Sequence, residues 1–301
     1  MTRLALLALI LVLPGSAQAL RLPGAARCPI FPRTNPWNTH VDKLPVAPNS
    51  DAIIRSIGMD VGLHPDFGSG LYDGQPIGIP FDVVTRNTRR TRVSFEYAEE
   101  SDKGPYPIPR NVHIEGGGDR HALLIDRDKC RLYELFALTG SESSRQAGSG
   151  AIWNLRSNKL RPAGWTSADA AGLPIFPGLA RYDEVARGVI DHALRFTAAR
   201  TRRAYVYPAR HYASSLTDPN LPPMGLRVRL KAGFDVGGFR KQARVILVAL
   251  KRYGMMVADN GANWFIGGAP NAHWNNDDLH TLGRVKGADF EVVQTGPLTV
   301  P

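Results

Sequence analysis

The sequence predicts a mainly β (α+β) fold, in the form of a single domain built as a β-sandwich or barrel with a few peripheral helices. Three observations carry this prediction. Short runs of β-branched and aromatic residues recur along the chain, and 30 glycines and 23 prolines supply turns between them. Helical periodicity extends over one long segment only. The predicted helices do not alternate with strands in the βαβ rhythm of a parallel α/β fold.

The strands are predicted from composition and from their bounding turns. Residues 121–127 (HALLIDR) and 131–137 (RLYELFA) are separated by a short polar turn and are expected to form a hairpin. Residues 255–260 and 263–268 flank an Asn-Gly dipeptide, which is favoured in tight hairpins, so a second hairpin is expected there. The other strand-like segments are residues 92–97, 188–198, 203–208, 225–231 and 289–293.

One long helix is predicted over residues 239–254, where apolar residues recur every three or four positions and a glycine supplies the stop signal. Shorter helices are predicted over residues 50–58, with Ser50 as a candidate N-cap, and over residues 181–187.

Residues 1–19 have the pattern of a secretory signal peptide, with Arg3, an apolar run and a small-x-small ending. No other segment approaches the length of a membrane-spanning helix, so no stable membrane anchor is predicted. We therefore expect a secreted or periplasmic protein with one β-rich domain over residues 20–301. In an oxidising compartment the two cysteines, Cys28 and Cys130, are expected to form a disulfide.

Lys and Arg exceed Asp and Glu by ten residues, but the excess is diffuse. It forms no block of five basic residues and does not alternate with stacking aromatics, so nucleic-acid binding is not predicted. An acidic polysaccharide or cell-wall glycan as partner would explain the excess through electrostatic attraction. A surface that is simply soluble explains it equally well. Both interpretations stay open, and we expect a monomer.

Missing motifs exclude several chemistries. The sequence contains no G-x-S-x-G elbow, no H-E-x-x-H, no P-loop, no dinucleotide fingerprint and no Cys/His metal pattern. The glycine run 116–118 lies between Glu115 and Asp119, whose charges would repel a phosphate group. We expect neither a cofactor nor a metal.

Four polar clusters remain as candidates. In HIEGGGDRH, Glu115, Asp119 and His121 are joined by glycines that allow a tight turn. Two carboxyl groups of different pKa are what glycosidic hydrolysis requires, one to protonate the leaving oxygen and one to attack or to activate water. The alternative is a charged loop ahead of a strand. Asp191 and His192 form the second cluster, and His192 would share a strand face with apolar residues, which fits a core histidine as well as a catalytic one.

The third cluster lies in a long Pro-bounded segment, residues 205–225, in which Arg210 and His211 are candidates for ligand binding. A surface loop tied down by its own short polar side chains is the alternative. The fourth cluster is the Trp- and Asn-rich stretch 258–282. Its indole rings could stack on sugar rings while its amides bind hydroxyls, or the indoles could be core and the amides turn formers. The residues expected to bind substrate are Arg210, His211, Asn263, Trp264 and Trp274.

Four segments resemble an uncharacterised family of secreted bacterial proteins: CPIFPRTNPWNTHVDKLPV, GDRHALLIDRDKCRLYELF, RPAGWTSADAAGLPIFPGLARYDEVARGVIDHALRF and the stretch 258–282. The resemblance extends over nearly the whole chain after residue 19. It implies export and a single domain, and it transfers no activity and no site residue.

The leading hypothesis is a secreted carbohydrate-active enzyme, a glycoside hydrolase, with acid, base or nucleophile drawn from Glu115, Asp119 and Asp191 and assisted by His121 and His192. A polysaccharide lyase on uronic-acid polymers is the nearest alternative, in which an Arg neutralises the substrate carboxylate and a His or Tyr abstracts the C5 proton. A non-catalytic glycan-binding module is the third. A catalytic site would gather its parts in one pocket, so we expect His121, His192 and His211 on one concave face, with Arg210 and Trp264 on its rim.

Overall fold

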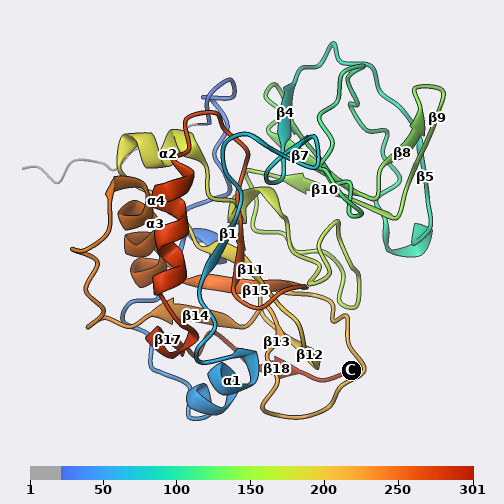
Figure 1. Ribbon diagram of the computed structural model, residues 1–301. Coiled ribbons are helices and arrows are strands. Elements are labelled where there is room, and N and C mark those ends of the chain that lie inside the picture. Colours follow the sequence, from blue (N-terminus) through green and yellow to red (C-terminus); the bar gives the residue numbers. More distant parts are fainter. Residues whose placement is uncertain (1–21) are drawn as a thin grey trace, which may run out of the picture.

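The computed structural model describes residues 22–301, so the predicted signal peptide lies outside the described residues. Strands make up 27% and helices 17% of these residues, which confirms the prediction of a mainly β fold. Figure 1 shows two sheet regions side by side, with most of the helices beside the first and the second at the upper right. None of the helices within residues 22–301 is long and apolar enough to cross a bilayer.

The first region is a mixed six-stranded sheet in the order β1-β16-β11-β15-β14-β17. Helix α3 (Lys241–Arg252) joins β14 to β15, packs on β14 and also contacts two further helices, α2 and α4, whereas α1 lies against β17. The strands are β1 (His64–Asp66), β11 (Leu194–Ala198), β14 (Arg227–Leu230), β15 (Met255–Asn260), β16 (Phe265–Gly267) and β17 (Phe290–Val292). The other helices are α1 (Ser50–Ile57), α2 (Tyr182–Arg187) and α4 (Asn276–His280), and the short 3-10 helices are η1 (Pro36–Asn38), η2 (Ala98–Glu100), η3 (Phe176–Gly178), η4 (Thr281–Arg284) and η5 (Gly287–Asp289).

The second region is a four-stranded sheet in the order β10-β7-β6-β4. Its β6–β7 hairpin is the one predicted from the sequence, with Cys130 in the turn at φ 49. Its strands are β4 (Phe81–Val84), β6 (Ala122–Asp126), β7 (Arg131–Phe136) and β10 (Ser149–Asn154). Three smaller sheets comprise β2 (Leu71–Tyr72) with β3 (Gln75–Pro76); β5 (Val93–Phe95) with β8 (Thr139–Ser141) and β9 (Ser144–Ala147); and β12 (Arg202–Val206) with β13 (Pro223–Met224) and β18 (Leu298–Thr299).

Three structural predictions need correction. The hairpin expected around Asn260 does not form, because β11 lies between β15 and β16 and pairs with both. The strand expected over residues 188–198 is limited to β11, because Gly188 adopts φ 87 where α2 ends and the chain enters the sheet only at Leu194. In addition, Ser50 is the first residue of α1 rather than its cap, and its Oγ accepts the backbone N–H of Val292.

One hydrophobic core connects the two regions. Strand β6 contributes Leu123 and Ile125 to the main core, which also contains Phe196 of β11. The alternate residue Leu124 of β6 points to a second core around Tyr106, as the two-residue period of a strand requires. Because both faces of β6 are covered, all five of its residues are buried. The main core therefore extends from the six-stranded sheet to one face of the four-stranded sheet.

The disulfide between Cys28 and Cys130 is present, as predicted. It ties the N-terminal segment to the β6–β7 turn across 102 positions of sequence. In the chain-entropy model, closing a loop of this length stabilises the fold by about 4–5 kcal/mol.

Candidate active site

Two neighbouring hollows lie where the two sheet regions meet. The large pocket has a volume of about 660 Å³ and is bounded by β1, the β2–β3 hairpin, the glycine run after Glu115, and α4. The small pocket has a volume of about 380 Å³, and its lining includes Asp119, Phe136, Asp169, His211 and Asp259. The two pockets interact electrostatically. The charge of Asp119 in the small pocket raises the pKa of the Asp66 carboxyl group in the large pocket.

Arg195 of β11 is a buried cation shared by this region. Its Nε and Nη2 donate to Oδ2 and Oδ1 of Asp169 at 3.1 and 2.9 Å, which is the two-pronged geometry of a strong charge-assisted pair. The strand register places Asp66, Gly267 and Arg195 in one row across the sheet. Arg195 therefore lies close to the carboxyl groups of Asp66 and Asp259, whose pKa values it lowers. Two of its guanidinium nitrogens already donate to Asp169.

Asp259, at the end of β15, has the properties of a proton donor. Burial raises the pKa of its carboxyl group to about 7, and the nearby charge of Asp169 adds to this, while Arg195 acts in the opposite direction. A sizeable fraction of Asp259 is therefore protonated near neutral pH, as a general acid requires. It is half-buried on the wall of the small pocket.

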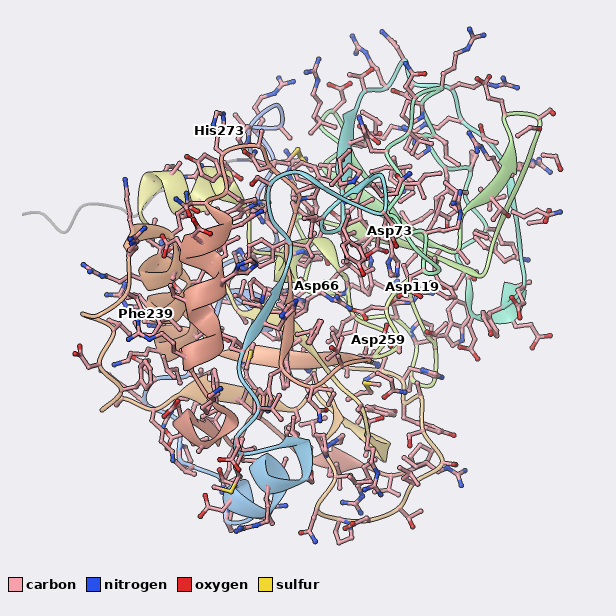
Figure 2. The ribbon with its side chains drawn as sticks, viewed as in Figure 1. Asp66, Asp73, Asp119, Phe239, Asp259 and His273 are labelled. Carbon is pink, nitrogen blue, oxygen red and sulfur yellow. A yellow bond between two sulfur atoms is a disulfide. The ribbon has the colours of Figure 1, made fainter. Side chains whose placement is uncertain are left out.

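Asp66, at the end of β1, is a second perturbed carboxyl group. It is exposed toward the large pocket, but the surrounding walls partly desolvate it, and this raises its pKa. His64 and Arg195 lower that pKa, whereas Glu115 and Asp119 raise it. Figure 2 shows Asp66, Asp119 and Asp259 in the middle of the molecule, at the junction of the two sheet regions.

His121 is buried and positions Glu115. Its Nδ1 lies 2.5 Å from Oε2 of Glu115, and its Nε2 lies 2.9 Å from the carbonyl oxygen of Ala168. Burial alone would lower the pKa of His121, but the hydrogen bond and charge of Glu115 outweigh burial and raise it. With both ring nitrogens engaged by acceptors, His121 has no nitrogen free for a ligand. It fixes the loop that carries Glu115 along the border of the large pocket.

The three histidines expected on one concave face are not all brought together. His211 lines the small pocket, with its Nδ1 against the carbonyl oxygen of Ala170 at 2.8 Å. His192 lines neither pocket. It is buried, with Nε2 at 3.1 Å from Oε2 of Glu184, and Glu184 is also paired with Arg181. Asp191 lies outside both pockets as well, where its charge acts on Tyr253.

The two tryptophans expected as sugar platforms are core residues. Trp264 is fully buried between Phe196 and Phe290, with ring centroids 5.5 and 5.1 Å away, and its Nε1 donates to the carbonyl of Gly58. Trp274 is also buried, and its Nε1 donates to the carbonyl of Ala269. Neither indole presents a face to a ligand, because tertiary packing covers both.

The other two residues expected to bind substrate serve the backbone. Asn263 accepts the backbone N–H of Ala199, so it stabilises a turn. Arg210 donates from Nε to the carbonyl oxygen of Arg161 and lines neither pocket. Three of the residues that were expected in the site line a pocket: Glu115, Asp119 and His211.

Two pocket residues, Asp66 and Asp169, escaped the sequence-based prediction, and so did the buried Arg195 that pairs with Asp169. A signal existed for Arg195, because an arginine inside an otherwise apolar strand is rarely buried without a charged partner. Asp259 stood beside an Asn-Gly dipeptide, which favoured a turn-forming role. No pattern in the sequence indicates that these residues meet.

Within residues 22–301, no group of three or more His, Cys, Asp or Glu side chains is arranged to hold a metal ion. Comparison of the chain with family models, curated proteins and solved structures finds no family model that matches and no significantly similar protein.

Proposed function

We propose that the protein is an exported glycan-cleaving enzyme, a glycoside hydrolase, with its reaction centre in the small pocket. The observation that carries the proposal is the pair of carboxyl groups on the pocket wall. Asp259 comes from the six-stranded sheet and has a pKa of about 7, whereas Asp119 comes from the loop before β6 and is exposed. A proton donor and a second carboxyl group in one cleft are the two groups that glycosidic hydrolysis uses.

In the proposed reaction Asp259 donates its proton to the glycosidic oxygen as the bond to the anomeric carbon breaks. Asp119 either takes a proton from an attacking water molecule or bonds to the anomeric carbon before water displaces it. One water molecule is consumed by either route, and Asp259 recovers a proton before the next cycle. Tyr97, Phe136 and His211 supply flat faces for a sugar ring.

Charge favours a hydrolase over a uronate lyase. Neither pocket includes a lysine or arginine among the lining residues that the structure describes. Arg195 is buried and already paired with Asp169. A uronate carboxylate would therefore face carboxylates without a cation to neutralise it, which disfavours removal of the adjacent C5 proton.

The disulfide is compatible with an extracellular location, and export remains part of the proposal.

The test is release of reducing ends by the purified chain from a panel of neutral, amino-bearing and acidic polysaccharides. We expect Asp259→Asn and Asp119→Asn each to lower kcat by about 10²–10⁴-fold on the cleaved substrate. Asp235→Asn, at an exposed position between β14 and α3, is the matched control and should retain full activity. Products that absorb in the near ultraviolet would indicate a lyase. Binding to a glycan without any cleavage would indicate a binding module, and either result contradicts the proposal.

A further inference from the structure

The large pocket is an assembled cavity whose walls come from distant parts of the chain. Asp66 lies at the end of β1, and Asp73 lies in the tight turn of the β2–β3 hairpin at φ 49. Glu115 is held by His121. An ideal Cβ on Gly116 would lie 2.6 Å from Cβ of Gln75, so the missing side chain lets the hairpin dock against the glycine run. The hairpin and the glycine run together close one side of the cavity.

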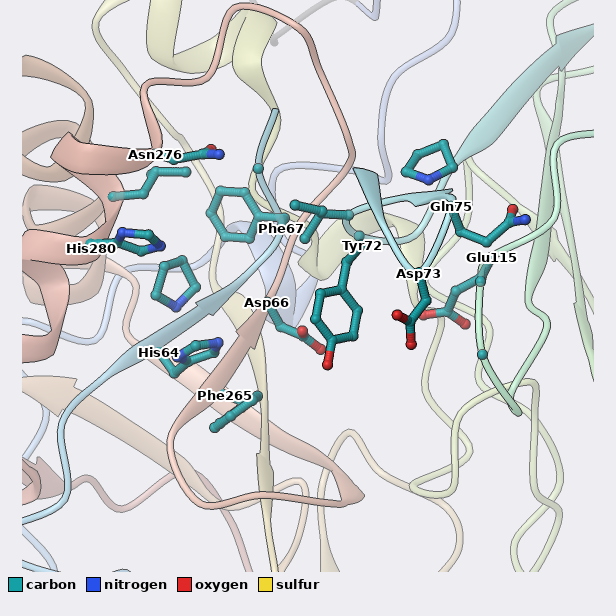
Figure 3. A pocket seen from close by; sticks show the side chains of 18 residues that line it. His64, Asp66, Phe67, Tyr72, Asp73, Gln75, Glu115, Phe265, Asn276 and His280 are labelled. Atoms are coloured by element: carbon teal, nitrogen blue, oxygen red, sulfur yellow. The ribbon is translucent and has the colours of Figure 1, made fainter. Parts of the chain in front are cut away.

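The pocket combines carboxylates with aromatic rings. Figure 3 shows the side chains of Asp66, Tyr72, Asp73 and Glu115 directed toward a common space. Tyr72 is 75% exposed, which is unusual for a large aromatic side chain without a partner. Opposite the hairpin, Phe265 lines the pocket beneath His64, with ring centroids 4.0 Å apart. A ligand in this cavity would therefore contact both aromatic faces and acidic oxygens.

The charge of the pocket is opposite to that of the whole chain. The chain carries a formal net charge of +10, yet no lysine or arginine appears among the described residues that line this cavity. Burial lowers the pKa of His64 and outweighs the charge of Asp66, which raises it, while the charge of His280 lowers it further, so His64 contributes little positive charge at neutral pH. One oxygen of Glu115 is engaged by His121 behind the pocket wall, whereas no lysine or arginine of the wall pairs with Asp66 or Asp73, so these carboxylates are available to a positively charged group.

An organic cation suits the pocket better than a metal ion. No group of acidic and histidine side chains within residues 22–301 converges closely enough to coordinate a metal. An ammonium group does not need several ligands at one point, and it is attracted by carboxylates and by aromatic faces together. The cavity is also larger than a lysine side chain requires and neighbours the small pocket, which fits a sugar unit of a longer chain.

We infer that the large pocket binds an amino-bearing sugar unit of a cationic glycan, with its ammonium group attracted by the carboxylates of Asp66, Asp73 and Glu115 and its ring against Tyr72 and Phe265. This inference rests on the proposed function, because it assigns the substrate class of the same cleft. The basic residues of the chain then lie outside the binding cleft and do not select the substrate.

Binding is tested apart from cleavage, in the Asp259→Asn background, by calorimetric titration. The probes are a glucosamine pentamer, its fully N-acetylated counterpart, a neutral glucose pentamer, a uronate pentamer and a lysine pentapeptide. We expect the glucosamine pentamer to bind at least tenfold more tightly than the other probes, and its affinity to fall as salt rises from about 0.05 to 0.5 M.

Two variants locate the binding site. Asp73→Asn keeps a residue that tolerates the left-handed backbone at this turn and should weaken binding of the glucosamine pentamer about tenfold. Tyr72→Ala should weaken both glucosamine and N-acetylated pentamers, whereas Asp235→Asn should change neither.

The outcomes separate the two proposals. Equal affinity for all glycans, tighter binding of the uronate pentamer, tighter or equal binding of the lysine peptide, or no effect of Asp73→Asn would overturn the amino-sugar assignment while leaving a hydrolase possible. Selective binding of the glucosamine pentamer by a wild-type chain that cleaves no glycan would overturn the proposed function and leave the binding assignment standing.

Discussion

Gly267 of β16 leaves the space in which Arg195 of β11 lies: an ideal Cβ on Gly267 would be 3.2 Å from both Cγ and Nη1 of Arg195. A side chain at this position therefore requires a shift of a few tenths of an ångström in the arginine that binds Asp169 and that acts on Asp66 and Asp259. The backbone at Gly267 does not require glycine, so the effect of a substitution there is steric.

We expect Gly267→Ala to lower the free energy of unfolding by about 1–3 kcal/mol, as overpacking of a tight site does. Activity per folded molecule should fall as well, because Arg195 shifts. Gly283→Ala is the matched control, since the nearest atom to its added Cβ lies 4.0 Å away and its backbone is also not left-handed. Urea unfolding of both variants checks the prediction. It fails if both alanines have the same effect.

Asp259→Asn should be more stable than the wild type at pH 8, although the proposed function predicts that its kcat is strongly lowered. The native pKa of Asp259 is raised to about 7, so the folded state binds a proton that the unfolded state has already released. The free energy of unfolding of the wild type therefore falls as pH rises from about 4 to 7. The variant has no carboxyl group at position 259, so it does not show this fall. We expect a gain on the order of 2–4 kcal/mol at pH 8 and little gain near pH 4.

Urea unfolding at the two pH values measures this difference directly. Glu134 also has a pKa raised to about 7 by burial, but it is common to both proteins and cancels in the comparison. An identical gain at both pH values would show that the ionisation of Asp259 is not its source.

Glu115→Gln should destabilise the fold most at low pH. The native pKa of His121 is raised because Glu115 outweighs burial. The stability that this pair contributes is therefore fully present below the ordinary histidine pKa and is lost as pH rises through the native value. We expect a loss of about 1.5–3 kcal/mol at pH 6 and a smaller one at pH 9.

Asp82→Asn is the matched control, because it changes a pair whose imidazole is open to solvent: the side chain of His113 is 68% exposed, and that of Asp82 is 15% exposed. The amide oxygen of Asn can still accept the backbone N–H of His113, and water screens the imidazole, so this variant should lose only about 0–1 kcal/mol. Unfolding curves at pH 6 and 9 test both variants. Equal losses for the buried and the exposed pair would contradict the assignment of His121 as a charged, buried anchor.

Local pattern accounts for the elements that the sequence predicted correctly. The β6–β7 hairpin and helix α3 are defined by residues that are neighbours in the chain, so composition and periodicity were sufficient to find them. The order of the strands in the sheet could not be predicted from such local patterns. β11 separates β15 from β16 because of long-range pairing, which a turn dipeptide such as Asn260-Gly261 does not encode.

The candidate site was recovered only in part for a related reason. Glu115 and Asp119 stand out as acidic residues beside glycines, whereas the pKa of Asp259 depends on Asp169 and Arg195, which come from other segments. An indole side chain suits a sugar-binding surface and a hydrophobic core equally, so the residue type of Trp264 does not distinguish the two roles. Its burial is decided by Phe196 and Phe290, which lie far from it in the chain.

The contrast between His192 and His211 separates a core role from a role in the cleft. His192 is buried beside Glu184, whose pKa is lowered because Arg181 and His192 outweigh its burial. We expect His192→Ala to cost about 3–5 kcal/mol of unfolding free energy, since it removes one partner of a buried charge. The fraction that remains folded should keep its kcat within about twofold, because His192 touches neither pocket.

His211→Ala should do the reverse, with a small change in stability and a clear loss of glycan turnover, because His211 lines the small pocket. Melting temperature and turnover measured on the same preparations decide between the two roles, and a stable but inactive His192→Ala protein would place His192 in the catalytic machinery after all.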